Sequence, residues 1–367
     1  MQVRIKPVFS AVLILLHSAF AYAQPKVLPM PAAYEIQAPA NQPDATPVGQ
    51  GMPLPGSLTG AVVPVTGAVS GAQSSATPAE ASTAPVEDFL ELPFERPRGA
   101  WRQDGKIASL VPSSNTVLTA NFAVEADFSV YQFFGNNEAA VRTYVNNLFL
   151  AVSSIYEADI KVKIQPSIVR VWTKPDPWSS LTTTLSVLQA ASPYWGKHHK
   201  TVPRAGVVVL SMRSLGGGIA YLNTLCNENA MDATFDKAYG IAIAGNLKGV
   251  ISTVPGVNTW DVVVVAHELG HNFNSDHTHC TPRVNSVGFY DKCYVSGVSS
   301  CFAGPAVAGN GTIMSYCHAG PGTIGMAAIN PMHFVDATGD PAHTNVMRAS
   351  AEEYTVGNNP QGCLIPN

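Results

Sequence analysis

The chain of 367 residues carries a formal net charge of −4 at pH 7, and only 13% of its residues are charged. The two signs are balanced along the chain and there is no basic stripe, which argues against a nucleic-acid partner. The length leaves room for one domain with a sizeable hydrophobic core, and we assign residues 99–367 to it.

The N-terminus has the pattern of a cleavable signal peptide. Arg4 and Lys6 precede an apolar run at residues 8–20, and the small residues up to Ala23 suit a cleavage site. The apolar run is shorter than the roughly 20 residues that a membrane-spanning helix needs. No cysteine stands at the cut, so we expect no lipid or membrane anchor. These features predict a signal peptide at residues 1–23 and a secreted protein, either extracellular or periplasmic.

Residues 24–98 are rich in Pro, Ala, Gly and Ser and show neither helical nor strand periodicity. Such a segment cannot bury enough apolar surface to offset the entropy lost on ordering it. We therefore predict a disordered linker or a prosegment. Residues 86–94 have a more mixed composition and are a candidate docking patch.

The domain that follows alternates between strand and helix patterns. A strand is expected at residues 121–131, and the apolar positions between Val141 and Ile155 recur at helical spacing. Further strand patterns cover residues 160–164, 168–172, 205–210 and 239–244, and further helix patterns cover residues 181–191 and 345–354. This order predicts an α/β fold with a mainly parallel sheet.

The strongest chemical signal lies between Trp260 and His279. His267 and His271 are four residues apart, so on a helix both imidazoles lie on one face and can bind one ion. Glu268 can then reach a water on that ion. The pattern predicts a catalytic zinc site, in which the pKa of the water falls to about 7 and Glu268 takes its proton and later returns it.

The third ligand is expected to be His277, which requires the chain to leave the helix and turn back. Asn274 suits this turn because Asn tolerates a left-handed backbone. Residues 262–265 are four valines, for which propensity favours a strand. The ligand spacing favours a buried helix instead, capped by Asn258 or Thr259.

Two motifs carry a family resemblance. Residues 267–277, HELGHNFNSDH, resemble the long zinc motif of the metzincin metalloproteases, with Asn274 where the family usually has Gly, and residues 311–316, GTIMSY, resemble their Met-turn. Residues 125–172 resemble the start of the adamalysin (reprolysin) branch. The resemblance implies a zincin-type α/β domain with a twisted mixed sheet, mostly parallel, long helices that include the zinc-binding helix, and a smaller C-terminal subdomain. We expect no disintegrin or other accessory domain after it.

The resemblance also implies roles for two residues of the Met-turn. Met314 would form a hydrophobic floor under the zinc ligands without binding the metal. Tyr316 stands two residues later, where the astacin and serralysin branches have a Tyr that reaches the metal or the oxyanion of the reaction. The alternative is a Tyr that only packs beside the Met-turn.

The glycine-rich residues 215–222 resemble the edge strand on which the family binds its substrate. An extended peptide would pair with the backbone of this strand, a mode that reads main chain rather than side chains. The alternative is an ordinary bulge at the glycines. The candidate substrate-binding residues are Gly218, Ile219, Ala220 and Tyr221.

All six cysteines lie in the second half of the chain, and an even number in an exported protein suggests three disulfides. By resemblance to adamalysins, Cys226 would pair with Cys363. The remaining four allow three pairings and are Cys280, Cys293, Cys301 and Cys317. Many metzincin zymogens block the zinc with a prosegment cysteine, but none precedes Cys226 here, so any latency must use another group, such as a carboxylate.

Together these patterns favour a monomeric, secreted zinc endopeptidase that acts on extended polypeptides. Two alternatives stay open: a catalytically inactive, zinc-containing binding module, and a gluzincin with Glu352 or Glu353 as the third ligand. One zinc ion is expected and calcium is left open. His279 and His318 are near the ligands in sequence and are expected to face solvent.

Overall fold

The structure is a computed structural model that describes residues 33–37, for which only the backbone is considered, and residues 115–226, 238–254, 259–297, 299–320, 325–358 and 362–367. The predicted signal peptide, the docking patch at residues 86–94 and the candidate cap Asn258 lie outside the described residues. So does nearly all of the predicted linker.

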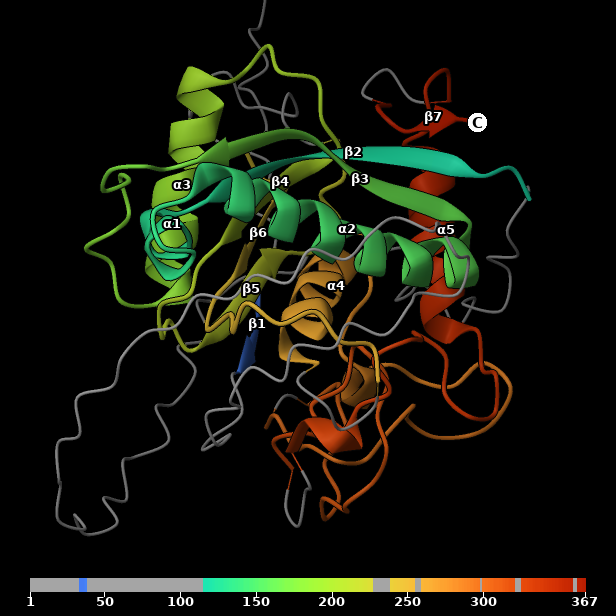
Figure 1. The fold of residues 1–367 in the computed structure, drawn as a ribbon. Coiled ribbons are helices and arrows are strands. Elements are labelled where there is room, and N and C mark those ends of the chain that lie inside the picture. The colour runs from blue at the N-terminus through green and yellow to red at the C-terminus, as the bar shows by residue number, and fades with distance from the viewer. Residues whose placement is uncertain are drawn as a thin grey trace, which may run out of the picture.

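A mixed sheet forms the centre of the domain (Figure 1). Its strands are β1 Ala33–Gln37, β2 Leu118–Ala126, β3 Val162–Val171, β4 Gly206–Leu210, β5 Gly217–Tyr221, β6 Ile241–Ala244 and β7 Ile365–Pro366. The strand order is β1-β5-β6-β4-β2-β3, and β7 pairs with β2. Strands β3, β2, β4 and β6 are parallel to one another. Strand β5 is antiparallel to β6, and β1 is antiparallel to β5. The predicted α/β fold with a mostly parallel sheet is confirmed.

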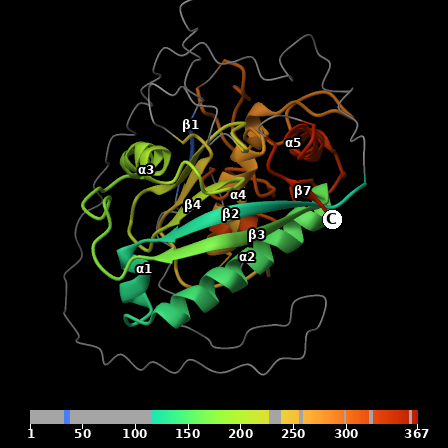
Figure 2. The same cartoon turned by 90° about the horizontal axis from the view of Figure 1, so that it is seen from above.

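Helices cover both faces of the sheet (Figure 2). They are α1 Phe128–Phe133, α2 Glu138–Ile160, α3 Thr184–His198, α4 Trp260–Asn272 and α5 Ala342–Glu353. One hydrophobic core lies between the sheet and helices α2 and α4, and a second lies between the sheet and α3. The sheet is therefore buried on both faces, as its continuous apolar strands require.

Helix α2 shows how local chemistry sets these elements. The side chain of Asn137 accepts a hydrogen bond from the N–H of Ala140 and caps the start of the helix, and Lys161 ends it in a left-handed conformation. The apolar positions predicted from Val141 to Ile155 are all buried. Periodicity and capping thus agree on a long helix against the sheet.

Several predicted boundaries are wrong. The strand expected to reach Tyr131 ends at Ala126, because the carboxylate of Asp127 caps α1 by accepting the N–H of Val130. Helix α3 begins at Thr184, after a capping box at Thr183, and continues beyond residue 191 to His198.

Two strands expected at residues 160–164 and 168–172 form one strand, β3, whose register with β2 shifts once. A second correction concerns the predicted linker. Residues 24–98 were expected to contain no strand, yet β1 pairs with β5 over its whole length. Strand β1 forms its backbone hydrogen bonds with β5, about 180 residues away in sequence. Periodicity within residues 24–98 therefore could not indicate this strand.

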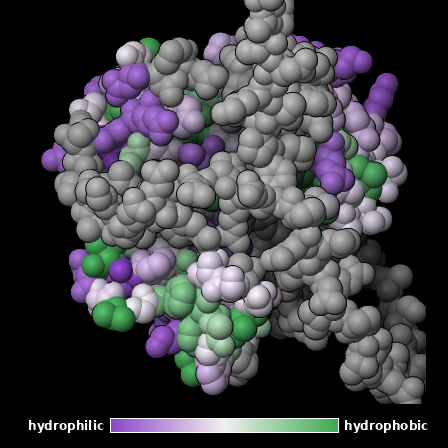
Figure 3. Space-filling model, turned by 180° about the vertical axis from the view of Figure 1, so that it is seen from behind, coloured by the Kyte–Doolittle hydropathy of each residue, from purple (hydrophilic) through white to green (hydrophobic). Residues whose placement is uncertain are grey.

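The described residues between 273 and 341 contain little regular structure besides two short 3₁₀ helices, Thr278–Cys280 and Gly325–Ala328. Two disulfides, Cys280–Cys301 and Cys293–Cys317, cross-link this region, and a third, Cys226–Cys363, joins the end of β5 to the C-terminal segment. Apolar side chains gather at the lower end of the molecule in Figure 3. Among the residues described, no helix is both long and apolar enough to cross a membrane.

Candidate metal centre

Helix α4 carries the predicted ligands, and all of its residues are buried. The four valines at residues 262–265 are helical, as the ligand spacing predicted, because full burial stabilises a helix that is apolar all round. Thr259 precedes the helix but makes no capping hydrogen bond with its side chain. Instead, the buried carboxylate of Asp261 accepts hydrogen bonds from the Tyr144 hydroxyl and from the backbone N–H of Lys248.

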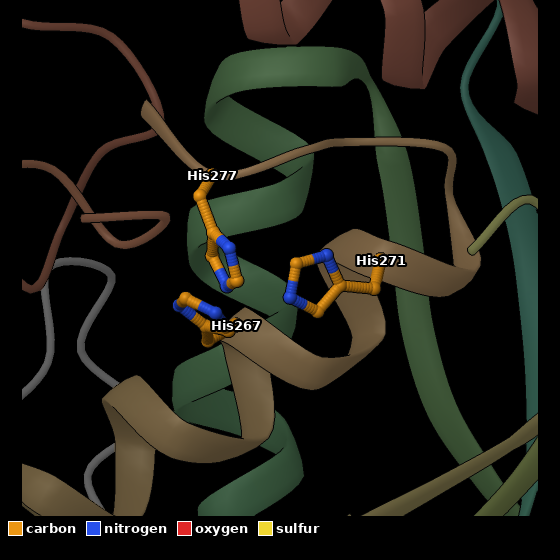
Figure 4. A group of neighbouring side chains, drawn as sticks. All are labelled: His267, His271 and His277. Carbon is orange, nitrogen blue, oxygen red and sulfur yellow. The ribbon is translucent and has the colours of Figure 1, made fainter. Parts of the chain in front are cut away.

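Three imidazoles converge on one point (Figure 4). His267 and His271 project from α4 and His277 from the segment that follows, and their nearest ring nitrogens all lie within 4.8 Å of one another. The chain turns at Asn274, whose φ of 73° is left-handed, as predicted. Burial, helical spacing and this turn thus bring together three residues that the sequence selected.

The hydrogen bonds of the rings determine which nitrogens face that point. Nδ1 of His267 lies 2.7 Å from the carbonyl oxygen of Ile313, and Nδ1 of His271 lies 2.7 Å from that of Ser275. A carbonyl can only accept, so each Nδ1 carries the proton and each Nε2 keeps a lone pair. Within the described part of the chain, the buried Nε2 of His267 has no hydrogen-bond partner.

The electrostatics of the three rings also suit a metal. Burial lowers the pKa of His271 to about 3 and holds the pKa values of His267 and His277 well below the usual range. All three are therefore neutral imidazoles at pH 7, the form that binds a metal. Inward-facing lone pairs on buried, neutral rings fit a single divalent ion such as zinc.

Glu268 is buried beside His267 and also lies against the sheet. A methyl group on Gly218 of β5 would stand 2.5 Å from Oε1 of Glu268. Only glycine therefore lets β5 approach α4 this closely, which explains the small residue at this position. The predicted substrate strand and the predicted proton acceptor are direct neighbours.

Met314 has no exposed surface. A methyl group on Gly270 would stand 2.5 Å from its sulfur, so this glycine of α4 makes room for the Met-turn. The carbonyl of Met314 accepts a hydrogen bond from the N–H of Thr278, which directly follows the third ligand. The turn that carries Met314 thus contacts both segments that supply ligands.

Tyr316 packs on the third ligand. Its ring centroid lies 4.4 Å from that of His277 and 6.0 Å from that of His267. The expectation that His279 and His318 face solvent is wrong, since both are buried. His279 stacks on the ring of His277, and His318 packs edge-on against Tyr316, so aromatic packing excludes water from both.

Two supporting residues were missed by sequence reasoning. The hydroxyl of Ser275 lies 2.7 Å from Nδ1 of His343, a buried residue of α5 that is 68 positions away. Since the carbonyl of Ser275 orients His271, His343 supports a ligand through one intermediate residue. No sequence spacing could have indicated this contact, because it depends on how α5 docks.

Strand β5 pairs with β1 and β6 without a register shift, so its glycines do not mark a bulge. The two carboxylates considered as alternative ligands are not in the histidine cluster: Glu352 accepts a hydrogen bond from Arg348, and Glu353 lies on the same helix. Two other groups have ligand-type side chains close together, but their cysteines are in disulfides and offer no thiolate.

A mixed sheet packs on a helix that carries two inward-facing histidines and a buried glutamate, and a third histidine follows after a turn. This combination is that of a metallopeptidase. The family model described as metallo-peptidase family M12 (Reprolysin_5) matches residues 118–325, and the chain belongs to this family. M12 peptidases depend on a metal, usually zinc.

Similar solved structures include one titled "Structure of a chaperone-substrate complex", with 12% identity and a TM-score of 0.37 over 65% of this chain and 34% of that chain. Another is metalloproteinase-II from Bacteroides fragilis, with 16% identity and a TM-score of 0.29 over 45% of each chain. The chain thus spans less than half the length of either structure, and the assignment rests on the family model.

Proposed function

We propose that this M12 peptidase is a secreted zinc endopeptidase of the adamalysin (reprolysin)-like branch that cleaves extended polypeptides. The observation that carries the proposal is the cluster of three buried, neutral imidazoles beside the carboxylate of Glu268. A structural metal site has no use for a general base, so the position of Glu268 favours catalysis over the inactive binding module.

In the proposed mechanism, His267, His271 and His277 hold one zinc ion. When bound, zinc lowers the pKa of a water molecule and polarises the substrate carbonyl. Glu268 accepts the proton of the attacking water and donates it to the leaving amine. Burial of the site excludes bulk water and strengthens these interactions.

The substrate is proposed to bind as an added strand along Gly218, Ile219, Ala220 and Tyr221. Backbone N–H and C=O groups at the edge of β5 would hold it in an extended form. Because Gly218 lies directly against Glu268, a substrate paired with this strand would lie near the proposed proton acceptor. Recognition of this kind fits polypeptides of varied sequence.

Tyr316 is proposed to donate a hydrogen bond from its hydroxyl to the developing oxyanion. Its ring lies near those of two proposed ligands, His267 and His277, which supports this role. Tyr316→Phe keeps the ring and removes only the donor. We expect kcat to fall about 100-fold with KM nearly unchanged, whereas a pure packing role would leave kcat within a factor of two or so.

For the whole chain, we propose a signal peptide at residues 1–23, a prosegment within residues 24–98 and the catalytic domain at residues 99–367. The three disulfides are typical of proteins that fold in an oxidising compartment, which supports export. We further propose that the mature protein is a monomer.

The test is cleavage of casein by the purified secreted protein loaded with zinc. Activity should disappear with a chelator and return when zinc is added back. Glu268→Ala should reduce kcat by roughly 1,000-fold or more, as loss of an essential catalytic group does, while zinc still binds. Glu157→Ala, which changes an exposed glutamate of α2, is the matched control and should retain full activity. Bound zinc without chelator-sensitive cleavage would instead support the binding module.

A further inference from the structure

Strand β5 already has a partner on the edge where a substrate would bind. Residues 33–37 of the N-terminal segment pair with it antiparallel, and the register matches all five residues of β5, from Ala33 opposite Tyr221 to Gln37 opposite Gly217. The other edge of β5 pairs with β6. Both edges of this strand are therefore occupied by segments of the same chain (Figure 1).

The pairing brings β1 to the metal centre. Ile36 lies opposite Gly218, the residue whose missing side chain lets β5 approach the carboxylate of Glu268. Cα atoms of β1 also lie within 8 Å of Cα atoms of α4. The main chain of β1 thus follows the path that the proposed function gives to the substrate.

Strand β1 and a substrate cannot occupy this edge of β5 at the same time. A strand has two edges, and the backbone N–H and C=O groups on one edge can serve only one neighbouring strand. A substrate must therefore displace β1 before it can pair with β5. Because β1 belongs to the same chain, its local concentration is of millimolar order, which a dilute substrate cannot match.

We propose that residues 33–37 are an intramolecular blocking strand that keeps the peptidase latent by filling the substrate edge of β5. The inference rests on the proposed function. It also accounts for latency without a prosegment cysteine, since no cysteine precedes Cys226. Backbone pairing with β5 would take the place of the prosegment cysteine that blocks the metal in many metzincin zymogens. Release of residues 33–37 from β5 would then open the site.

Hydrogen–deuterium exchange tests the contact without any need for activity. The full chain with Glu268→Ala, which cannot cut itself, is compared with the same chain in which residues 33–37 are replaced by Gly-Ser-Gly-Ser-Gly. The replacement should speed exchange of the β5 amides about 10-fold or more, while β4 amides stay unchanged. An equal replacement at residues 61–65 is the matched control and should change neither. Unchanged β5 exchange in the first variant would overturn the proposal.

Activity provides the second measurement. With Glu268 intact and equal zinc content, the chain with replaced residues 33–37 should cleave a peptide substrate at least 10-fold faster than the full chain, and the control at residues 61–65 should match the full chain. Equal rates would show that β1 does not block the site. A third outcome separates the two proposals. If none of the three chains cleaves the peptide although zinc is bound, and β5 amides still exchange faster after replacement of residues 33–37, the pairing of β1 with β5 is supported and the proposed catalysis is wrong.

Discussion

The two regions that carry the proposed metal ligands are stabilised in different ways. The sheet and its helices up to Asn272 are held by two large hydrophobic cores and regular backbone hydrogen bonds. The described part of residues 273–341, which contains His277 and the Met-turn, has little regular structure and two short-range disulfides.

In this second region, side chains form hydrogen bonds and ion pairs that stabilise the irregular backbone. The carboxylate of Asp340 accepts hydrogen bonds from the backbone N–H groups of Val284 and Asn285, and Arg283 forms an ion pair with Asp336. Two of the proposed ligands thus lie on a buried helix, and the third follows the turn at Asn274 in an irregular segment. The site depends on both regions at once.

The largest expected effect comes from removing the single ligand that the irregular region supplies. His277→Ala leaves two imidazoles, and we expect zinc affinity to fall well over 100-fold, beyond the loss typical of second-shell changes. Competition against a chromogenic chelator measures it. His198→Ala, which removes an exposed histidine at the end of α3, should leave affinity unchanged. Retained zinc in the His277 variant would revive the gluzincin alternative.

Removing one cross-link should loosen the irregular region while the sheet survives. Replacing Cys280 and Cys301 by Ser opens a loop with a sequence separation of 21. We expect about 3 kcal/mol less stability from the gain in chain entropy. Urea unfolding should show this loss, near-UV circular dichroism should weaken and the far-UV signal should persist. Simultaneous loss of both signals would mean that the two regions unfold as one unit.

The sheet contains a buried acid that makes stability depend on pH. Glu125 pairs with Arg170 at 3.1 Å, but desolvation outweighs this partner and raises the pKa of Glu125 from 4.5 to about 7. Folding therefore favours the protonated form. The stabilisation from this protonated carboxyl is complete below pH 4.5, declines as pH rises towards 7 and is lost above pH 7. The total loss of unfolding free energy is about 3 kcal/mol.

Glu125→Gln should remove this slope, because an amide does not titrate in that range. The check is the difference in urea-unfolding free energy between wild type and variant at pH 4.5, 6 and 8. Glu138→Gln, at an exposed ion pair on α2, is the matched control and should follow the wild-type curve. A wild-type curve parallel to that of Glu125→Gln would contradict the raised pKa.

The smallest effect is expected at the turn between the two regions. Asn274 has a left-handed φ of 73°, which glycine adopts without strain. Asn274→Gly should change the unfolding free energy by no more than about 0.5 kcal/mol, whereas Asn274→Ala should lower it by about 1 kcal/mol. Thermal unfolding of the two variants provides the comparison, and equal melting temperatures would show that this conformation carries no strain.

Sequence reasoning succeeded where a feature is local or periodic. The buried face of α2 follows from apolar spacing, and His267, His271 and His277 were selected by spacing alone before the structure brought them together. Asn274 was predicted to turn the chain because of its own backbone preference. In each case the physical information lies within a few residues.

The rest depends on tertiary packing. Burial of His279 and His318 follows from the rings around them, and the contact between Ser275 and His343 requires α5 to dock beside the segment that follows α4. Strand β1 forms only because β5 offers an open edge far along the chain. Such contacts leave no periodic trace in the sequence.

The disulfide between Cys226 and Cys363 closes a covalent ring that spans 137 positions and contains the three histidines of the cluster, His267, His271 and His277. A single cut by any protease inside this ring would leave the two pieces joined. On a gel without reductant such nicked molecules would run as one band and would separate only after reduction. A molecule cut once inside this ring thus keeps the segments that carry His267, His271 and His277 covalently linked.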